Sequence, residues 1–153
     1  MNETQATKEI EALHAFFEDW FGGLIKAEEA VFQERFASRF HDDCELIQPS
    51  GATLSREVFF KAVLDSHDSS PDFRIAIRNV RVRFVLPGGY TLVTYEEWQR
   101  NAVNSTPSDN ARAASVLFSE SNSAQPHWMH IHETWLPVAQ TPAERFEFYR
   151  SCA

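Results

Sequence analysis

The fold is decided by residues 73–100, FRIAIRNVRVRFVLPGGYTLVTYEEWQR. Apolar and polar residues alternate through most of this stretch, which is typical of β-strands with one buried face. The apolar positions are odd-numbered up to Ile77 and even-numbered from Val80, so one extra residue must lie between them. This change of parity predicts a β-bulge near Arg78-Asn79. Pro87-Gly88-Gly89 is typical of a turn, and we predict a hairpin of two long strands around it.

The register of this hairpin decides which residues share a face. A two-residue turn pairs Val82 with Tyr95, and it places Arg81 opposite Glu96 as a favourable charge pair. A three-residue turn loses that charge pair, so we predict the shorter turn. Glu97 then lies on the same face as Val82 and Tyr95. A carboxylate among apolar neighbours needs a partner, a shifted pKa or a wet pocket.

Upstream of the hairpin, three separate segments carry apolar residues at helical spacing. The first predicted helix ends at Gly22-Gly23, and the second runs over about residues 26–40. Residues 41–43 close the second helix, and residues 44–48 form a short strand. Ser55 is a suitable N-cap for the third helix. Helices followed by antiparallel strands predict an α+β domain.

Downstream of the hairpin, residues 101–110 form a long polar loop, and two further strands follow at residues 112–121 and 127–136. Residues 141–149 are predicted to form a short helix. With a five-residue loop between the last two strands, each face of the resulting hairpin carries both apolar and polar residues. One predicted face carries Val116, Phe118, Trp128, His130 and His132. The other carries Ser115, Leu117, Met129, Ile131, Glu133 and Trp135.

Composition and charge exclude several classes of function. The 153 residues carry a formal net charge of −8, from 14 Lys plus Arg against 22 Asp plus Glu, which disfavours nucleic acid and anionic membranes as partners. No apolar run approaches the ~18 residues of a membrane span, and the start of the chain has no signal-peptide core. Cys44 and Cys152 form no disulfide framework or metal motif. We therefore expect a single cytoplasmic domain without a cofactor.

Three segments together resemble a known superfamily. They are CELIQPSG (44–51), LVTYEEWQ (92–99) and WMHIHETW (128–135). With three N-terminal helices and a long bent sheet, residues 8–137 resemble the nuclear transport factor 2-like superfamily, in particular its SnoaL-like members and the association domain of calmodulin-dependent protein kinase II. Residues 138–153 are then a C-terminal tail.

This resemblance implies a cystatin-like cone, in which a curved, mainly antiparallel (mixed) β-sheet wraps around three N-terminal helices. It also implies a homodimer and a pocket between sheet and helices, lined in relatives by the strands around Tyr95 and around Ser115. The kinase association domain has arginines there, whereas this chain has Glu97 and Ser115, which disfavours a carboxylate ligand. Arg112, at the start of the second of these strands, remains available for ligand binding.

The candidate pocket residues combine aromatic rings with acids. The ligand-binding candidates are Tyr95, Glu97, Arg112, Ser115, Glu133 and Trp135. An apolar surrounding raises the pKa of a carboxylate toward neutrality, which suits Glu97 as a general base, and the phenol of Tyr95 can donate to a developing oxyanion. The alternative is a polar cluster that is satisfied within the protein and has no catalytic role.

Histidines supply a weaker signal. His130 and His132 leave the same face of one strand, which is the spacing of metal ligands. The sequence fixes no third ligand, so we predict no metal site. His14 and His67 lie beside apolar helical stripes and are interpreted as packed or surface residues and not as ligands.

Three classes of function remain open. The leading hypothesis is a protein that binds an unknown small molecule in a ring-lined, acid-containing pocket without turnover. The second is a lyase, isomerase or cyclase that uses Glu97 and Tyr95. The third is an oligomerisation domain, as in the kinase association family. Glu96 and Trp98 lie on the opposite face of the hairpin, where we expect homodimer contacts.

Overall fold

The computed structural model describes residues 1–120 and 125–137 as an α+β arrangement. The helices are α1 (Glu3–Phe21), α2 (Glu29–Arg35) and α3 (Arg56–Asp65), with a 3₁₀ turn at Ala37–Arg39. The strands are β1 (Phe40–Ile47), β2 (Thr53–Ser55), β3 (Arg74–Leu86), β4 (Tyr90–Arg100), β5 (Asn110–Ser119) and β6 (His127–Trp135). None of the helices described has the length and apolarity needed to cross a bilayer. The helix predicted at residues 141–149 lies outside the described residues.

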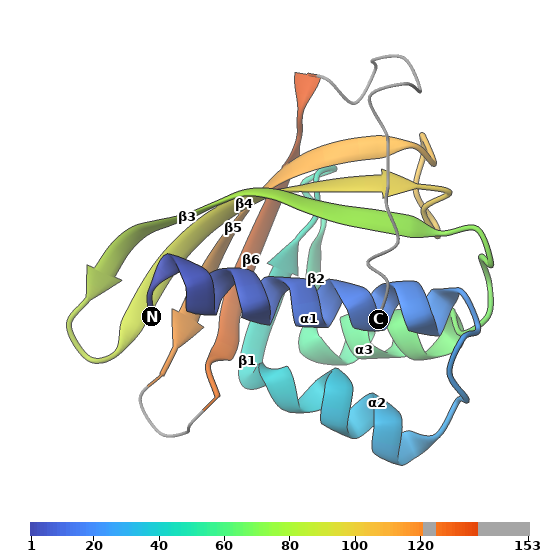
Figure 1. The fold of residues 1–153 in the computed structure, drawn as a ribbon, viewed down its shortest axis with the longest axis horizontal. Coiled ribbons are helices and arrows are strands. Elements are labelled where there is room, and N and C mark those ends of the chain that lie inside the picture. The colour runs from blue at the N-terminus through green and yellow to red at the C-terminus, as the bar shows by residue number, and fades with distance from the viewer. Residues whose placement is uncertain (121–124, 138–153) are drawn as a thin grey trace.

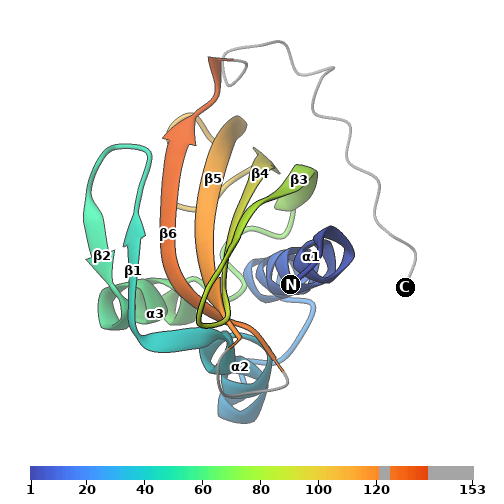
Figure 2. The same ribbon diagram turned by 90° about the vertical axis from the view of Figure 1, so that its left-hand side faces the viewer.

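In the described residues, six strands form one curved sheet in the order β2-β1-β6-β5-β4-β3. β1 and β6 pair in parallel, and the other neighbours pair antiparallel. α1 runs across the concave face of the sheet (Figure 1), and α3 packs against β1 and β2. Seen from the side, the sheet curls around the helices (Figure 2). The predicted mixed sheet wrapped around N-terminal helices is confirmed.

α1 forms because its sequence supplies both ends and a continuous apolar stripe. The Asn2 side chain accepts a hydrogen bond from the Gln5 backbone N–H, and the Gln5 side chain accepts one from the Asn2 backbone N–H, which is a capping box. The helix ends at the predicted Gly22-Gly23 pair, whose second glycine has a φ of +68°, in the left-handed region that favours glycine. The stripe is fully buried at Ile10 and Phe16.

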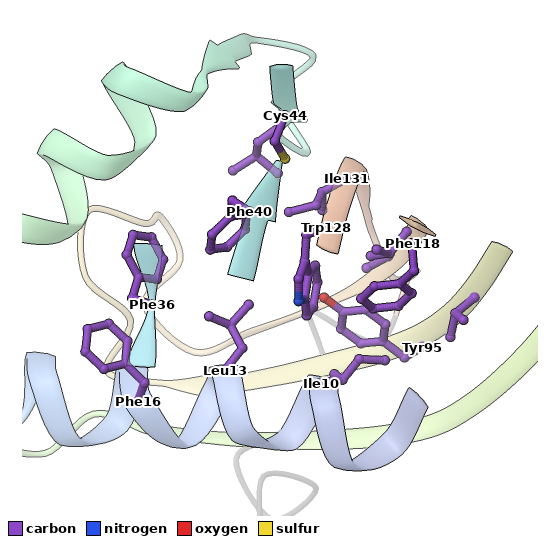
Figure 3. Packing of buried hydrophobic residues seen from close by; sticks show 14 of the residues in the cluster. Ile10, Leu13, Phe16, Phe36, Phe40, Cys44, Tyr95, Phe118, Trp128 and Ile131 are labelled. Atoms are coloured by element: carbon purple, nitrogen blue, oxygen red, sulfur yellow. The ribbon is translucent and has the colours of Figure 1, made fainter. Parts of the chain in front are cut away.

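The core joins α1 to the sheet through aromatic rings (Figure 3). Phe16 stacks on Phe36 with ring centroids 5.4 Å apart, and Phe36 contacts Phe40 at 4.9 Å. On the sheet side, Phe118 and Trp128 meet edge to face at 4.8 Å. Each aromatic pair of this kind stabilises a core by about 0.5–1.5 kcal/mol beyond the area that it buries. Many of the aromatic residues of the sequence therefore serve to form the core.

The β-bulge predicted near Arg78-Asn79 is confirmed. Asn79 has a φ of +53°, a conformation that asparagine tolerates better than most side chains, and the β3–β4 register shifts just after Arg78. Arg81 therefore lies opposite Thr94 and not opposite Glu96. A second register shift lies nearer the turn. Such irregularities bend a strand, which lets β3 follow the curve of the sheet.

The predicted two-residue turn is wrong. Leu86 pairs with Tyr90 across three turn residues, and Val82 pairs with Val93. The face predicted for Glu97 is nevertheless confirmed, because Glu97 lies on the concave side with 4% of its surface exposed. Alternation within β4 fixes that face whatever residues stand opposite.

The predicted second helix is too long. α2 ends at Arg35, and residues 41–43, expected to close the helix, lie in β1. Phe36 leaves the helical region with a φ of −123° and a ψ of −71°, and Phe40 already pairs with Trp128 of β6. Both phenylalanines reach the core, so aromatic spacing alone does not separate a continued helix from a turn followed by a strand.

The faces predicted for β5 and β6 are also wrong. The β5–β6 register shifts between Leu117 and Phe118, so the parity of β6 changes along its length. Trp128, Ile131 and Glu133 therefore share the concave face, each at most 8% exposed. A bulge leaves no signal in the hydrophobic pattern when both faces of a strand are mixed.

Candidate functional site

A cavity of about 370 Å³ lies between the helices and the concave face of the sheet. One side, here called the helix wall, is apolar and mainly aromatic, and it is formed by Leu13, Phe17, Phe21, Phe59, Val63 and Phe73. The polar groups of the lining, here called the polar wall, are His14 of α1 with Tyr95, Glu97, Gln99, Arg112 and Glu133 of the sheet, beside which Leu46, Trp128 and Ile131 also line the cavity. Trp135 and residues 103–106 lie at the more exposed rim. A bound molecule therefore meets both aromatic and polar groups.

His14 and Glu97 form a buried pair in the polar wall. His14 Nδ1 lies 2.6 Å from the Ile10 carbonyl oxygen, and Nε2 lies 3.0 Å from Glu97 Oε2. A carbonyl oxygen only accepts, so Nδ1 carries a hydrogen, and a second proton must lie between Nε2 and the carboxyl group. The side-chain amide of Gln99 donates to Glu97 Oε1. Both oxygens of Glu97 are thus engaged within the protein.

The surroundings of Glu97 keep it ionised. Burial alone would raise the pKa of this carboxyl, but the charge and hydrogen bond of His14, with Arg112 and Gln99, outweigh burial and lower the pKa to about 2. The carboxylate of Glu97 therefore carries its negative charge within ion-pair distance of the His14 ring. A carboxylate with so low a pKa is a weak base at neutral pH.

Arg112 lies between Glu133 and the rim of the cavity. Its Nη1 donates to Glu133 Oε2 at 2.8 Å, and its Nη2 makes longer hydrogen bonds of 3.4 Å to Gln99 and 3.3 Å to Asn110. The guanidinium carbon lies 5.0 Å from the centroid of the Trp135 ring, within the range of a cation–π contact. Arg112 Nε is buried and has no hydrogen-bond partner in the described part of the chain.

Glu133 differs from Glu97 in its contacts and in its titration. Oε2 accepts from Arg112, whereas Oε1 makes no hydrogen bond within the described residues and remains accessible from the cavity. Burial and the charge of Glu97 raise the pKa of Glu133 to about 7, although Arg112 opposes this shift. Glu133 therefore gains and loses a proton near neutral pH. Two acids in such different environments can serve as a proton carrier and a fixed charge.

Tyr95 and Trp128 both line the cavity, and the His14 ring contacts each of them, with centroid distances of 5.6 Å and 6.4 Å. Burial, together with the charges of Glu97 and Glu133, raises the pKa of Tyr95 well above 10. The phenol therefore stays protonated at neutral pH and can donate a hydrogen bond. The Trp128 indole N–H donates to Glu9 at 2.9 Å, so it is already committed to the protein.

Asn110 connects the polar wall to the rim loop, residues 101–109. Asn110 is fully buried, and its side-chain amide donates to Ser105 Oγ at 3.1 Å and to the Pro107 carbonyl oxygen at 3.0 Å. Its side-chain oxygen accepts from Arg112. One residue thus positions both the loop that lines the cavity and the arginine of the polar wall.

Most of the predicted site residues line this one cavity, namely Tyr95, Glu97, Arg112, Glu133 and Trp135. Ser115 does not line it, because it is exposed on the convex face of β5, between the buried Ala114 and Val116. The predicted grouping of Ser115 with Glu133 fails because Ala114 is the residue opposite Glu133.

His130 and His132 also lie away from the cavity. They pair with Leu117 and with Ser115 of β5, and neither contributes to the lining. Within residues 1–120 and 125–137, no cluster of three or more His, Cys, Asp or Glu side chains is arranged to hold a metal ion. These histidines add no group to the polar wall.

Sequence analysis misses two members of the polar wall, His14 and Gln99. It interprets His14 as a packed or surface residue, whereas the structure pairs it with Glu97. A usable signal exists, because His14 lies one turn after Ile10 on a buried stripe, where a polar side chain needs a partner. Gln99 extends the alternation of Tyr95 and Glu97 by one further step and is 9% exposed.

A comparison with protein families gives one match. Residues 6–137 match the family model described as sucrose-6-phosphate phosphohydrolase C-terminal. This match covers most of the chain. No curated protein matches the chain significantly.

Several solved structures have a similar fold. An NTF-2 like protein of unknown function from Pseudomonas aeruginosa is 20% identical, with a TM-score of 0.72 over 86% of this chain and 98% of that chain. A proposed dehydratase of the NTF2-like family from Streptomyces avermitilis is 14% identical, with a TM-score of 0.64 over 88% and 95%. The CamKII hub homology domain of Chlamydomonas reinhardtii is 16% identical, with a TM-score of 0.59 over 88% and 96%.

These similarities confirm the nuclear transport factor 2-like, cystatin-like fold that the sequence resembles. The family match extends from α1 to just beyond β6 and so includes every member of the polar wall. The chain belongs to the sucrose-6-phosphate phosphohydrolase C-terminal family.

Proposed function

We propose that the cavity binds a small, uncharged, ring-shaped molecule, and that this molecule is a sugar. The observation that carries the proposal is that aromatic and polar groups line one cavity. A sugar ring has a face of C–H groups that stacks on aromatic rings and a rim of hydroxyls that bond to carboxylate, amide and guanidinium groups. The volume of about 370 Å³ lies at the small end of the range of about 300–1,000 Å³ for ligand pockets.

The hydrogen-bonding groups left open in the polar wall suit hydroxyls. Glu133 Oε1 accepts, and the Tyr95 hydroxyl donates. A hydroxyl both donates and accepts, so it can pair with either group. Sucrose 6-phosphate, which the description of the family names, is itself a sugar derivative, and this agrees with the class of ligand proposed.

Nuclear magnetic resonance of the isotope-labelled full chain tests this proposal. Sucrose and glucose are titrated separately, and the indole N–H signals are followed. We expect saturable shifts for Trp135, at the rim of the cavity. Trp98 is the internal control, because it packs with Ala111 in a separate cluster outside the cavity. Shifts of Trp98 without shifts of Trp135, or no shifts with either sugar, would contradict sugar binding in the cavity.

A second candidate function, acid–base catalysis on the bound molecule, is favoured by the contrast between the two acids. Both oxygens of Glu97 accept hydrogen bonds, and its pKa is lowered. Glu97 is therefore better suited to act as a fixed negative charge than as the general base that the sequence predicts. Glu133 has an open oxygen and titrates near neutral pH. We therefore assign the proton-carrying role of this candidate function to Glu133, with Tyr95 as the hydrogen-bond donor.

Incubation of the sugar with the protein in heavy water tests this second function. Catalysis of proton transfer would place deuterium on the sugar or produce a new compound, and Glu133→Gln would abolish either change. An identical product spectrum with the Glu133→Gln variant would contradict the role of Glu133. No change in the sugar with the unaltered protein would leave binding as the function.

We also propose that the convex face of the sheet mediates self-association as a homodimer. Leu92 and Leu117 lie opposite each other there, and Glu96 and Trp98 share that face. Large apolar side chains on a sheet face are typical of an interface. Light scattering measures the mass in solution, where Leu117→Glu should dissociate the dimer and Leu64→Glu, at an exposed site on α3, should not. A monomeric parent protein would contradict this proposal.

A further inference from the structure

We infer that the cavity selects an uncharged sugar and rejects the same sugar carrying a phosphate group. This inference rests on the proposed sugar-binding function and narrows the class of ligand. It reverses what the family description alone would lead one to expect, since that description names a phosphorylated sugar. The contacts of the charged groups in the polar wall carry the argument.

Each cation of the polar wall is already paired with an acid. His14 lies 3.0 Å from Glu97, and Arg112 lies 2.8 Å from Glu133. All four side chains are at least seven-eighths buried, with exposed fractions of 4%, 6%, 12% and 9% for His14, Glu97, Arg112 and Glu133. With both acids ionised, the two negative charges cancel every positive charge that His14 and Arg112 can carry. An uncharged ligand leaves this balance intact.

A phosphate group would disturb the balance, because it adds a charge of about −1.5 to −2 at neutral pH. In a buried site such charges interact more strongly than in water. The phosphate would have to approach Arg112 while Glu133 and Glu97 repel it. Proteins bind phosphate with unpaired arginine or lysine side chains or with helix N-termini, and the polar wall presents two cations whose charges are both compensated.

The rim of the cavity offers no further cation. The lining residues there, all of them uncharged, are Trp135, residues 103–106 and the neighbouring Gln48, Pro49 and Ser50. Among the lining residues that the structure describes, Arg112 is the only arginine, and lysine is absent. A phosphate at the mouth of the cavity would therefore meet only neutral groups. It would lose its bound water and gain weaker hydrogen bonds in return.

Glu133 is the residue that sets this selectivity. It faces Arg112 of β5, Glu97 and Tyr95 of β4 and, through Glu97, His14 of α1. Glu133 loses its charge on protonation or on substitution with glutamine. The net charge of the polar wall then rises by one, and the Arg112 N–H group that is paired with the carboxylate becomes available to a ligand. Discrimination against phosphate should then weaken, while the shape of the cavity stays nearly the same.

Calorimetric titration of the full chain with sucrose and with sucrose 6-phosphate at about pH 8, where Glu133 is mainly ionised, tests the inference. We expect the parent protein to bind sucrose at least roughly tenfold more tightly, and Glu133→Gln to reduce that preference by roughly tenfold. Glu11→Gln, which removes one acid from the exposed side of α1, is the matched control and should keep the parent preference. Equal or tighter binding of sucrose 6-phosphate by the parent protein would overturn the inference. Binding of neither sugar would overturn the proposed function itself.

A second measurement avoids any effect of the substitution on folding. Glucose and glucose 6-sulfate are compared on the parent protein about one pH unit below and above the Glu133 pKa of about 7. The sulfate ester keeps its charge throughout this range, so a change in preference reports on the protein. We expect the preference for glucose to be several-fold smaller at the lower pH. A preference that is independent of pH would contradict the role of Glu133.

Discussion

Two buried ion pairs, Glu9–Arg39 and Glu133–Arg112, differ in whether they line the cavity. Glu9 Oε1 accepts from Arg39 at 2.7 Å and from the Trp128 indole at 2.9 Å, and Arg39 Nε donates to the backbone. Neither Glu9 nor Arg39 lines the cavity. Glu133 has one bonded and one open oxygen, and Arg112 has an unpaired Nε.

This difference separates a pair that holds the fold together from a pair that can serve a ligand. The Glu9–Arg39 pair joins α1 to the 3₁₀ turn and, through Trp128, to β6. The Glu133–Arg112 pair joins two neighbouring strands that already share a hydrogen-bonded register. Its charges therefore add little to the connectivity of the fold. We conclude that a place in the lining of the cavity, and not burial, marks the functional pair.

The largest effect should come from breaking the structural pair. Arg39→Met leaves the Glu9 carboxylate buried without its cation, which should lower the free energy of unfolding by about 3–5 kcal/mol. Denaturant unfolding measures this loss, and the affinity for sucrose at low temperature should stay unchanged. A large loss of affinity in the folded variant would show that the two pairs are not separate.

The next largest effect should appear in the pH dependence of stability. The pKa of Glu133 rises on folding from 4.5 to about 7, so its contribution is fully present below 4.5 and is lost as the pH rises through 7. This loss is on the order of 3 kcal/mol. Unfolding measured across this pH range should show the decline in the parent protein and in Glu11→Gln, but not in Glu133→Gln. A decline of the same size in Glu133→Gln would assign it to another group.

A moderate effect is expected at the rim. Trp135 is 38% exposed, so Trp135→Ala should change the free energy of unfolding by less than about 1 kcal/mol. It should nevertheless weaken sucrose binding by roughly tenfold, because it removes an aromatic ring from the cavity. Phe84→Ala, at another exposed aromatic residue, is the control and should leave affinity unchanged. Equal effects of the two substitutions would argue against a specific role for Trp135.

The smallest effect is expected at Ser115. Its side chain is exposed on the convex face, so Ser115→Ala should change stability by no more than about 0.5 kcal/mol. It should also leave sucrose affinity unchanged. A clear loss of affinity in a titration would mean that Ser115 faces the ligand, as the sequence alone led us to predict.

The alternation within single strands could be read from the sequence, and it placed part of the site correctly. β4 alternates over Tyr95 and Glu97, so both residues share a face whatever strand lies beside them. The α+β fold class could also be predicted from the sequence, because the apolar residues change from helical spacing to alternation along the chain.

Relations between distant segments could not be read in this way. His14 pairs with Glu97 across 83 positions, and no local pattern encodes that contact. Ser115 was assigned to the cavity because the register shift beside Leu117 leaves no trace in a strand with two mixed faces. Register depends on turn length and on bulges, and one residue of error moves a side chain to the other face.

The most direct test is a crystal structure of the full chain grown with sucrose. We predict a sugar ring between the helix wall and the polar wall, with hydroxyls within hydrogen-bonding distance of Glu133 Oε1 and the Tyr95 hydroxyl. Sucrose bound elsewhere, or a cavity filled by a wholly apolar molecule that leaves the polar wall without contacts, would contradict it.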